Sequence, residues 1–306
     1  MNTPNTPSTP NTPATPATPP PPATPNSPTT TSTPDVPTLT LNNGVTIPQL
    51  GFGVFQVPDD ETTAAVASAL DAGYRSIDTA AIYGNERGTG RAIAESGIAR
   101  DELFVTTKLW NDAQGYDSTL RAFDESAEKL GLDTIDLYLI HWPAPAKDLY
   151  LDTWRAFERL YADGRVRAIG VSNFEPEHLQ RILDLGGTVP AVNQVEAHPN
   201  LQQRAVQAFG AEHGVLTEAW SPLAQGGLLH DATITGIANR VGATPAQVIL
   251  RWHLDHGRIV IPKSVTPARI RENLASVDVR LTADDIAAID ALDNDGRVGP
   301  HPTDVN

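Results

Sequence analysis

The chain has 306 residues, of which 37 are acidic and 22 basic, so its formal charge is −15. This negative charge argues against a nucleic-acid partner, and the absence of cysteine excludes disulfides and thiolate metal sites. No apolar run approaches the ~20 residues that a membrane helix requires, and no secretory or transit signal precedes Arg75, the first basic residue. We therefore expect a soluble cytoplasmic protein that does not associate with membranes.

The first 37 residues differ in composition from the rest of the chain. Residues 1–37 are almost wholly Thr, Pro, Asn, Ser and Ala, and they contain half of the 26 prolines. Such a segment has few apolar side chains whose burial could offset the entropy of ordering. We predict a disordered, low-complexity tail over residues 1–37, followed by one α/β domain over residues 38–306.

Eight short apolar runs dominate the remaining sequence. A β-hairpin comes first, in "TLTLNNGVTIP", with its turn at Asn43 and Gly44. The runs then read "LGFGVF", "SIDTA", "LFVTTKL", "IDLYLIHW", "VRAIGVSN", "AVNQVEAH", "VLTEAW" and "RIVIPKS". Amphipathic stretches such as "DETTAAVASALDAG" separate them, and several of these stretches end at glycine, as helices often do. Eight β-then-α units predict an α/β fold of the closed (β/α)8, or TIM, barrel type with extra helices.

A doubly wound open sheet is the structural alternative. That fold binds dinucleotides through three glycines at the turn between a strand and a helix. The segment "GFGVFQ" lies inside an expected strand and lacks the third glycine, and "GTGRAI" lacks it as well. Neither segment provides the fingerprint of the open sheet.

Polar side chains lie at the ends of the apolar runs. They are Asp78, Lys108, His141, Ser172, Asn173, His198, Ser221, Lys263 and Ser264. In a (β/α)8 barrel the carboxyl ends of all strands open onto one face, and this face holds the active site. The polarity of loops explains the serines and asparagine well, but it explains a lysine or aspartate after a fully apolar run less well.

Four of these residues form a candidate catalytic set: Asp78, Tyr83, Lys108 and His141. A phenol has a pKa of ~10, which a nearby ammonium lowers, and a carboxylate can balance the charge of that ammonium. A histidine can hydrogen-bond a carbonyl oxygen or assist a proton relay. Each residue also has a structural interpretation, such as a turn cap for Asp78 or a core histidine for His141. Together they can protonate a carbonyl oxygen, but without an activated nucleophile or metal ligands they need a cofactor to attack the carbon.

A second candidate site lies in "IPKSVTPARIRENL", residues 261–274. Thr266 is a suitable N-cap and Pro267 suits a first helical turn, so a helix is expected to begin there. Lys263, Ser264 and Arg269 surround the helix start, whose free N–H groups attract anions. We predict a site for a phosphate monoester. An ordinary capped helix with basic surface residues is the alternative.

Seven segments resemble those of the aldo-keto reductases in order and spacing. They are "SIDTAAIYGNE", "TTKLWN", "IDLYLIHWP", "IGVSNF", "NQVEAHP", "AWSPLAQG" and "IPKS" with the arginine, glutamate and asparagine that follow it. The resemblance covers about residues 38–306 and is closest to the bacterial 2,5-diketo-D-gluconate reductase type. It implies NADPH-dependent reduction of an aldehyde or ketone on a (β/α)8 barrel.

The resemblance also implies a role for individual residues. Tyr83 would be the general acid, tuned by Lys108 and Asp78, and His141 would orient the substrate carbonyl. The implied cofactor contacts are Ser172, Asn173 and Gln194 at the nicotinamide amide, Trp220 on its ring, Ser221, Leu223, Gln225 and Gly226 at the pyrophosphate, Lys263, Ser264 and Arg269 at the 2′-phosphate, and Glu272 and Asn273 at the adenine. The expected walls of the substrate pocket are Phe55, Trp110 and Trp142, for which core packing is the alternative.

Two positions depart from the family pattern, and other functions stay open. Trp220 stands where many animal members have tyrosine. Thr266 stands where some bacterial members have arginine, which puts the preference for NADPH over NADH in doubt. A cofactor-binding regulatory or scaffold subunit with little turnover is the main alternative, favoured only by the Thr/Pro-rich tail. A cofactor-free isomerase would need paired carboxylates or metal ligands, which the sequence does not indicate.

The sequence does not identify the substrate. Small 2-keto carbonyls, keto-sugars and reactive aldehydes all suit the predicted chemistry. His253 and His256 in "WHLDHG" precede a glycine, so they suit a helix end better than a metal site. We expect a monomer that binds a small carbonyl compound and no metal.

Overall fold

The structure is a computed structural model that describes residues 1–2 and 35–306. The predicted disordered tail therefore lies almost wholly outside the described residues. In the part of the chain that is described, no helix has the length and apolar character needed to cross a membrane.

The predicted N-terminal hairpin is present. Strand β1 (Thr38–Thr40) pairs antiparallel with β2 (Thr46–Pro48). The turn between them uses Gly44 in the left-handed region, at φ 85°, and the Asn43 side chain accepts a hydrogen bond from the Val45 N–H at 3.2 Å. Asn-Gly therefore forms the turn for the reason that predicted it, since glycine takes positive φ without steric cost.

Eight parallel strands form one sheet in their order along the chain. They are β3 (Phe52–Gly53), β4 (Ser76–Asp78), β5 (Phe104–Leu109), β6 (Ile135–Ile140), β7 (Val166–Ser172), β8 (Val192–Glu196), β9 (Leu216–Trp220) and β10 (Ile259–Val260). A parallel bridge between Leu50 and Val260 joins the two edges, and the Gly51 N–H donates to the Val260 carbonyl at 2.9 Å. The sheet therefore closes, which confirms the predicted (β/α)8 barrel over the open sheet.

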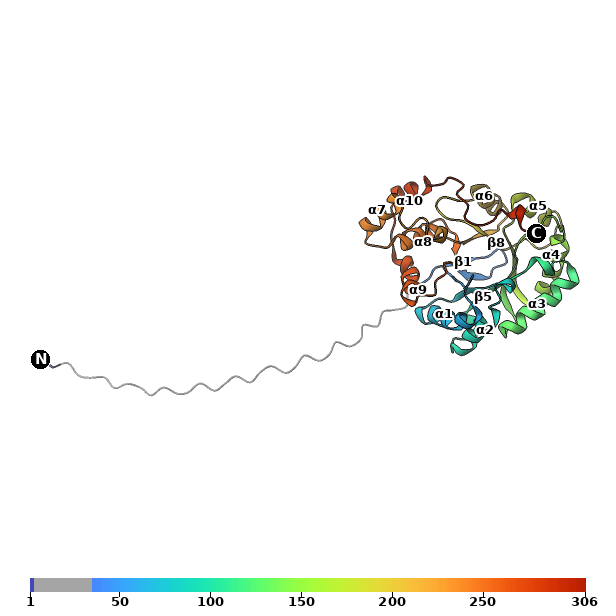
Figure 1. Cartoon of the computed structure of the whole chain (residues 1–306), viewed down its shortest axis with the longest axis horizontal. Helices are drawn as coiled ribbons and strands as arrows, with labels where there is room; N and C mark the ends of the chain where they lie inside the picture. The colour runs from blue at the N-terminus through green and yellow to red at the C-terminus, as the bar shows by residue number, and fades with distance from the viewer. Residues whose placement is uncertain (3–34) are drawn as a thin grey trace. The chain divides into compact units, whose positions relative to one another are not determined.

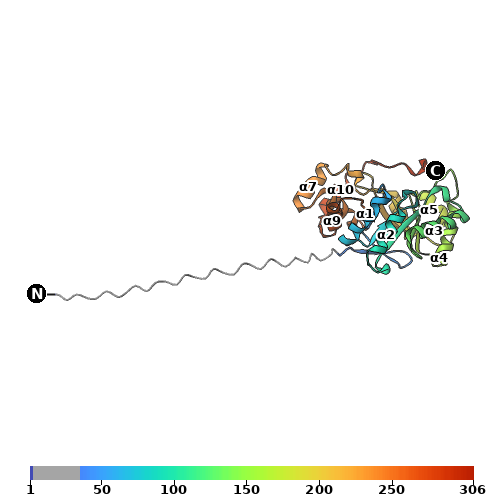
Figure 2. The same cartoon turned by 60° about the horizontal axis from the view of Figure 1, so that its bottom comes forward.

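Helices surround the strands (Figure 1). They are α1 (Asp59–Ala72), α2 (Glu86–Glu95), α3 (Tyr116–Leu130), α4 (Tyr150–Ala162), α5 (Pro176–Leu183), α6 (Arg204–Glu212), α7 (Ala232–Val241), α8 (Pro245–Asp255), α9 (Pro267–Leu274) and α10 (Ala283–Asp290). Helices α7 and α10 lie side by side in both views and share an apolar cluster with α8 (Figures 1 and 2). The barrel therefore carries extra helices, as the sequence predicted.

Glycines allow helix α2 to pack closely on both of its neighbours. A Cβ at Gly88 would lie 2.6 Å from the Asp59 carbonyl oxygen at the start of α1, and a Cβ at Gly90 would lie 2.3 Å from the Leu130 carbonyl oxygen at the end of α3. Both contacts are with backbone atoms, which cannot move aside as a flexible side chain can. The glycines of "GTGRAI", which lack the spacing of a dinucleotide motif, therefore serve helix packing.

The C-terminal segment runs back to the barrel. In both views its end lies beside α5 (Figures 1 and 2). The Asn306 side chain accepts a hydrogen bond from the Ala146 N–H at 2.8 Å, in the loop between β6 and α4. The last residues of the chain are thereby brought to the carboxyl ends of the strands.

Candidate active site

A buried ion pair joins neighbouring strands at the carboxyl end of the barrel. The Lys108 ammonium on β5 donates to the Asp78 carboxylate on β4 at 2.6 Å and to the Thr79 carbonyl at 2.9 Å. The two charged side chains are 0% and 3% exposed. Burial alone would lower the pKa of Lys108, but the charges of Asp78 and other neighbours outweigh burial and raise it. Lys108 is therefore a fixed positive charge inside the barrel.

The Tyr83 phenol lies next to this charge. The Lys108 nitrogen lies 5.2 Å from the centre of the Tyr83 ring, which a short 3₁₀ turn, η1 (Ala81–Tyr83), carries directly after β4. Burial raises the pKa of the phenol, and the charge of Lys108 acts in the opposite direction, as the sequence predicted. Burial is the larger effect, so the net pKa lies above its ordinary value, which corrects the expectation that the nearby ammonium would lower it. The phenol is thus protonated at neutral pH, as a proton donor must be.

His141 follows β6 and faces Tyr83 edge-on, with 5.6 Å between the ring centres. Burial lowers the pKa of His141 well below its ordinary value, and the charge of Lys108 lowers it further. The imidazole is therefore neutral and carries a single N–H. Its Nδ1 atom is buried and has no hydrogen-bond partner among the described residues.

The three predicted pocket aromatics surround Tyr83 and His141. The Phe55 ring lies 5.0 Å from the Tyr83 ring and is 52% exposed. The Trp110 ring lies edge-on to His141 with 5.3 Å between the ring centres, and the Trp142 ring is nearly parallel to His141 with 6.3 Å between the ring centres. Phe55 and Trp110 are accessible enough to contact a ligand, whereas Trp142 is buried and supports His141.

The residues expected at the nicotinamide form a hydrogen-bonded group. Asn173, in the left-handed region at φ 64°, donates to the His141 carbonyl at 2.9 Å. Its side-chain oxygen accepts from the Trp220 indole N–H at 2.8 Å. The Ser172 hydroxyl donates to the Gln194 carbonyl at 2.7 Å. These bonds fix the side chains relative to His141, although they lie up to 79 positions along the chain from it.

A second carboxyl group, which the sequence analysis missed, lies behind this group. The Gln194 amide nitrogen on β8 donates to Asp78 at 2.8 Å and to Glu218 on β9 at 3.0 Å. Burial, and then the charge of Asp78, raise the pKa of Glu218 to about 8. A charged residue inside a short barrel strand, two positions before Trp220, was the available signal. The absence of paired carboxylates inferred from the sequence is therefore corrected, because Asp78 and Glu218 share one donor.

The turn after β9 gathers the residues expected at the pyrophosphate. Ser221 and Gln225 adopt left-handed backbone conformations, at φ 47° and 53°, as does Gly226 at φ 90°. For residues other than glycine this conformation costs of order 1–3 kcal/mol each, so the surrounding structure must hold it. Leu223 is partly buried, and its carbonyl accepts from the Gly226 N–H at 2.8 Å. Such strained turns concentrate at functional sites.

The predicted anion site lies at the start of helix α9, which begins at Pro267 as expected. The Thr266 side chain forms no capping hydrogen bond, and the Thr266 N–H donates instead to the Ser264 hydroxyl at 3.1 Å. Lys263 and Arg269 are exposed. Two cations therefore flank a helix start without a side-chain cap, which suits a phosphate.

The two residues expected at the adenine lie further along α9. The Glu272 carboxylate accepts a hydrogen bond from the Thr244 hydroxyl at 2.7 Å, and the Glu272 carbonyl accepts from the Gln247 side chain at 3.0 Å. Asn273 is 5% exposed. Glu272 therefore ties α9 to the start of α8, and Asn273 packs into the interior. The sequence held no signal for these structural roles.

A strap of the C-terminal segment, residues 297–299, is fastened over Trp220. The buried Glu196 carboxylate accepts from the N–H groups of Val298 at 2.6 Å and Gly299 at 2.9 Å, and from His198 at 2.9 Å. A Cβ at Gly299 would lie 2.5 Å from the Trp220 ring. The strap therefore packs directly against the side chain expected to stack on the nicotinamide.

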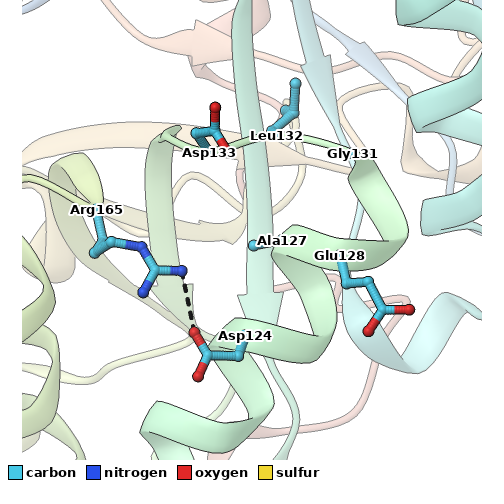
Figure 3. Close-up of a pocket in the computed structure, with 7 residues that line it drawn as sticks. All are labelled: Asp124, Ala127, Glu128, Gly131, Leu132, Asp133 and Arg165. Atoms are coloured by element: carbon cyan, nitrogen blue, oxygen red, sulfur yellow. Dashed lines mark hydrogen bonds and ion pairs between the residues drawn. The ribbon is translucent and has the colours of Figure 1, made fainter.

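One surface hollow of about 540 Å³ lies away from these residues. Its lining consists of Asp124, Ala127, Glu128, Gly131, Leu132, Asp133 and Arg165 (Figure 3). Arg165 forms an ion pair with Asp124 at 3.0 Å across it. Arg165 comes directly before β7 and Asp133 shortly before β6, so the hollow lies at the amino ends of the strands. The predicted catalytic residues lie at the opposite end of the barrel, at the carboxyl ends of the strands.

The fold and site define a class of protein: a (β/α)8-barrel enzyme with titratable side chains grouped at the carboxyl ends of the strands. Residues 49–294 match the sequence model described as "Aldo/keto reductase family". The chain belongs to this family and is an oxidoreductase, as its motifs predicted.

Similar proteins support this assignment. An "Aldo-keto reductase" of Mycobacterium sp. (strain JLS) is 56% identical over 270 residues, which cover 88% of this chain and 98% of that protein. A "Glyoxal reductase" of Bacillus subtilis (strain 168) is 53% identical, covering 88% and 97%, and a "Methylglyoxal reductase DkgA" of Yersinia pestis is 52% identical, covering 87% and 96%. The crystal structure of a Gox0644 mutant in complex with NADPH has a TM-score of 0.85, is 51% identical, and covers 88% of this chain and 98% of that one. The DkgA relative confirms the resemblance to the 2,5-diketo-D-gluconate reductase type, because DkgA is 2,5-diketo-D-gluconate reductase A.

Proposed function

We propose that this protein is an NADPH-dependent reductase that converts an aldehyde or ketone to an alcohol, with Tyr83 as the general acid. The observation that carries the proposal is the buried Lys108–Asp78 ion pair, whose side chains are 0% and 3% exposed. The Lys108 nitrogen lies 5.2 Å from the centre of the Tyr83 ring. A buried positive charge beside a phenol stabilises the phenolate that remains after proton transfer. Asp78 keeps Lys108 charged, and so it acts on the phenol through the lysine.

His141 completes the proposed acid site. Because the imidazole is neutral, it can donate one N–H to a carbonyl oxygen without competing for the proton that Tyr83 delivers. The imidazole ring contacts Trp110 and Trp142, and these contacts restrict its orientation. Tyr83 and His141 together would hold the carbonyl oxygen between two donors and leave the carbon open to the hydride that NADPH supplies when bound.

The described residues fit this cofactor at three places. Gln194, Asn173 and Trp220 are held next to His141 by the hydrogen bonds given above, and they would bind the nicotinamide end. The left-handed turn after β9 would follow the pyrophosphate. Lys263 and Arg269, at the start of α9, would bind the 2′-phosphate that distinguishes NADPH from NADH.

For the substrate we propose small 2-oxoaldehydes such as methylglyoxal and glyoxal. Relatives that are 52–53% identical carry the names of reductases for these compounds. Phe55 beside Tyr83 and Trp110 beside His141 offer uncharged, accessible rings, which suit a small neutral carbonyl compound. A cytoplasmic, monomeric protein stays the expectation from the sequence.

The substitution Tyr83→Phe tests the proposal. Loss of the phenolic proton should lower turnover by about 10²–10⁴-fold, the usual contribution of general acid catalysis. NADPH should still quench tryptophan fluorescence. Tyr116→Phe is the control, because Tyr116 is 40% exposed at the start of α3. A Tyr83→Phe protein with near-full activity would refute the assignment, and NADPH binding without oxidation by any aldehyde would favour a regulatory or scaffold subunit.

A further inference from the structure

Glu218 occupies the interior of the barrel directly beside Gln194. The two residues are register partners on the parallel strands β8 and β9. Glu218 is 1% exposed, and its side-chain oxygen accepts from the Gln194 amide nitrogen at 3.0 Å. The same nitrogen donates to Asp78 across the barrel at 2.8 Å. Both hydrogens of the Gln194 amide group are thereby directed at carboxyl groups.

This arrangement decides how the Gln194 amide is oriented. Turning the amide over would place its oxygen against the Asp78 carboxylate, so that two acceptors would face each other. In the observed orientation the Gln194 oxygen accepts no hydrogen bond within residues 35–306, and it is not among the atoms sealed from solvent. The oxygen is therefore available to accept from a bound ligand.

The charges around Glu218 favour its protonated form. Asp78 is paired with the Lys108 ammonium at 2.6 Å, so these two groups together are neutral. The titratable groups that act on Glu218 are Asp78, which disfavours its ionisation, and Lys108, which partly compensates. The strand on its other side, β10, contributes Ile259 as register partner and no charge. An ionised Glu218 would add one uncompensated negative charge to a buried site, since Glu218 is 1% exposed.

We propose that Glu218 is a positioning residue of the reduction site: as a neutral carboxylic acid it orients the Gln194 amide, and when ionised it disfavours the phenolate of Tyr83. The second effect follows because a negative charge raises the pKa of a nearby phenol. Contacts run from Glu218 through Gln194 and Asp78 to the Lys108 nitrogen, which lies 5.2 Å from the Tyr83 ring centre. The inference rests on the proposed function, since Gln194 and Tyr83 are taken to serve the cofactor and the substrate.

A direct titration separates this inference from the proposed function. Carboxyl carbons are followed by ¹³C NMR from acid to alkaline pH in the wild type and in Glu218→Gln. A glutamate signal with a midpoint near pH 8 should be present in the wild type and missing in the variant. If that signal titrates near the ordinary value of 4.5 instead, the inference is overturned. The experiment needs no turnover, so it also decides the matter if the protein fails to reduce any carbonyl.

Cofactor affinity and pH profiles then test the positioning role. Glu218→Gln retains an acceptor for Gln194 and should bind NADPH like the wild type, whereas Glu218→Leu, which has no acceptor, should bind about 2–10-fold more weakly, as expected for one lost hydrogen bond. The pH profile of kcat/KM should lose one ionisation near pH 8 in Glu218→Gln. The exposed Glu128→Gln is the control. Wild-type affinity in Glu218→Leu, or an unchanged pH profile in Glu218→Gln, would contradict the proposal.

Discussion

Because the Glu218 carboxyl is buried, we expect the free energy of unfolding to depend on pH. In the folded protein the pKa of Glu218 is raised from 4.5 to about 8, whereas in the unfolded chain it takes its ordinary value. Between these pH values the folded state holds a proton that the unfolded state has released. Raising the pH through this interval therefore favours unfolding. The substitution Glu218→Gln removes the titrating group and keeps the shape of the side chain.

The size of the effect follows from linkage. One proton held only by the folded state changes the free energy of unfolding by about 1.4 kcal/mol per pH unit. From pH 4.5 to about 8 the accumulated loss is about 5 kcal/mol for this one residue. At pH 5 the two proteins should differ in stability by no more than about 1 kcal/mol, because a neutral acid and an amide make similar hydrogen bonds. At pH 8 the variant should be the more stable by several kcal/mol.

Urea unfolding at a series of pH values between 5 and 8.5 measures this difference. The wild-type free energy of unfolding should fall more steeply with pH than that of Glu218→Gln, and the two curves should separate progressively from about pH 5 upward. Glu128→Gln, with a side chain that is 75% exposed, should follow the wild type throughout. Parallel curves for the wild type and Glu218→Gln would refute the claim that Glu218 is a proton-bearing acid in the folded protein.

Three further substitutions have expected outcomes. Lys108→Met strands the Asp78 carboxylate in the interior and should lower the free energy of unfolding by about 3–5 kcal/mol, with part recovered in the double variant with Asp78→Asn; additive costs in a double-mutant cycle would contradict a direct pair. Gly299→Ala places a Cβ 2.5 Å from the Trp220 ring and should weaken NADPH binding, measured by fluorescence. Unchanged NADPH binding would contradict a strap that borders the cofactor. Arg269→Ala should weaken NADPH binding by about 10–100-fold and leave NADH binding unchanged; an equal loss for both cofactors would exclude a 2′-phosphate contact.

Local sequence determined the barrel and much of the candidate catalytic set. Each strand and helix has its own pattern of apolar residues, and Asn43–Gly44 determines its turn locally, through the positive φ of Gly44 and the Asn43 side-chain hydrogen bond to the Val45 N–H. In a closed parallel barrel the carboxyl ends of the strands meet on one face, so Asp78 and Lys108 were predicted to meet from their places at strand ends. These features depend on residues close in sequence or on the topology that eight repeated units impose.

Only the tertiary structure decided which side chains touch across the barrel. Gln194 and Asp78 are 116 positions apart, and Glu196 and Val298 are 102 positions apart, yet each pair is hydrogen-bonded. All residues of β8 are buried, so the strand shows no alternation of polar and apolar positions from which the inward side chains could be identified. The raised pKa of Glu218 likewise depends on burial and on charges from other strands, and both arise only when the barrel closes.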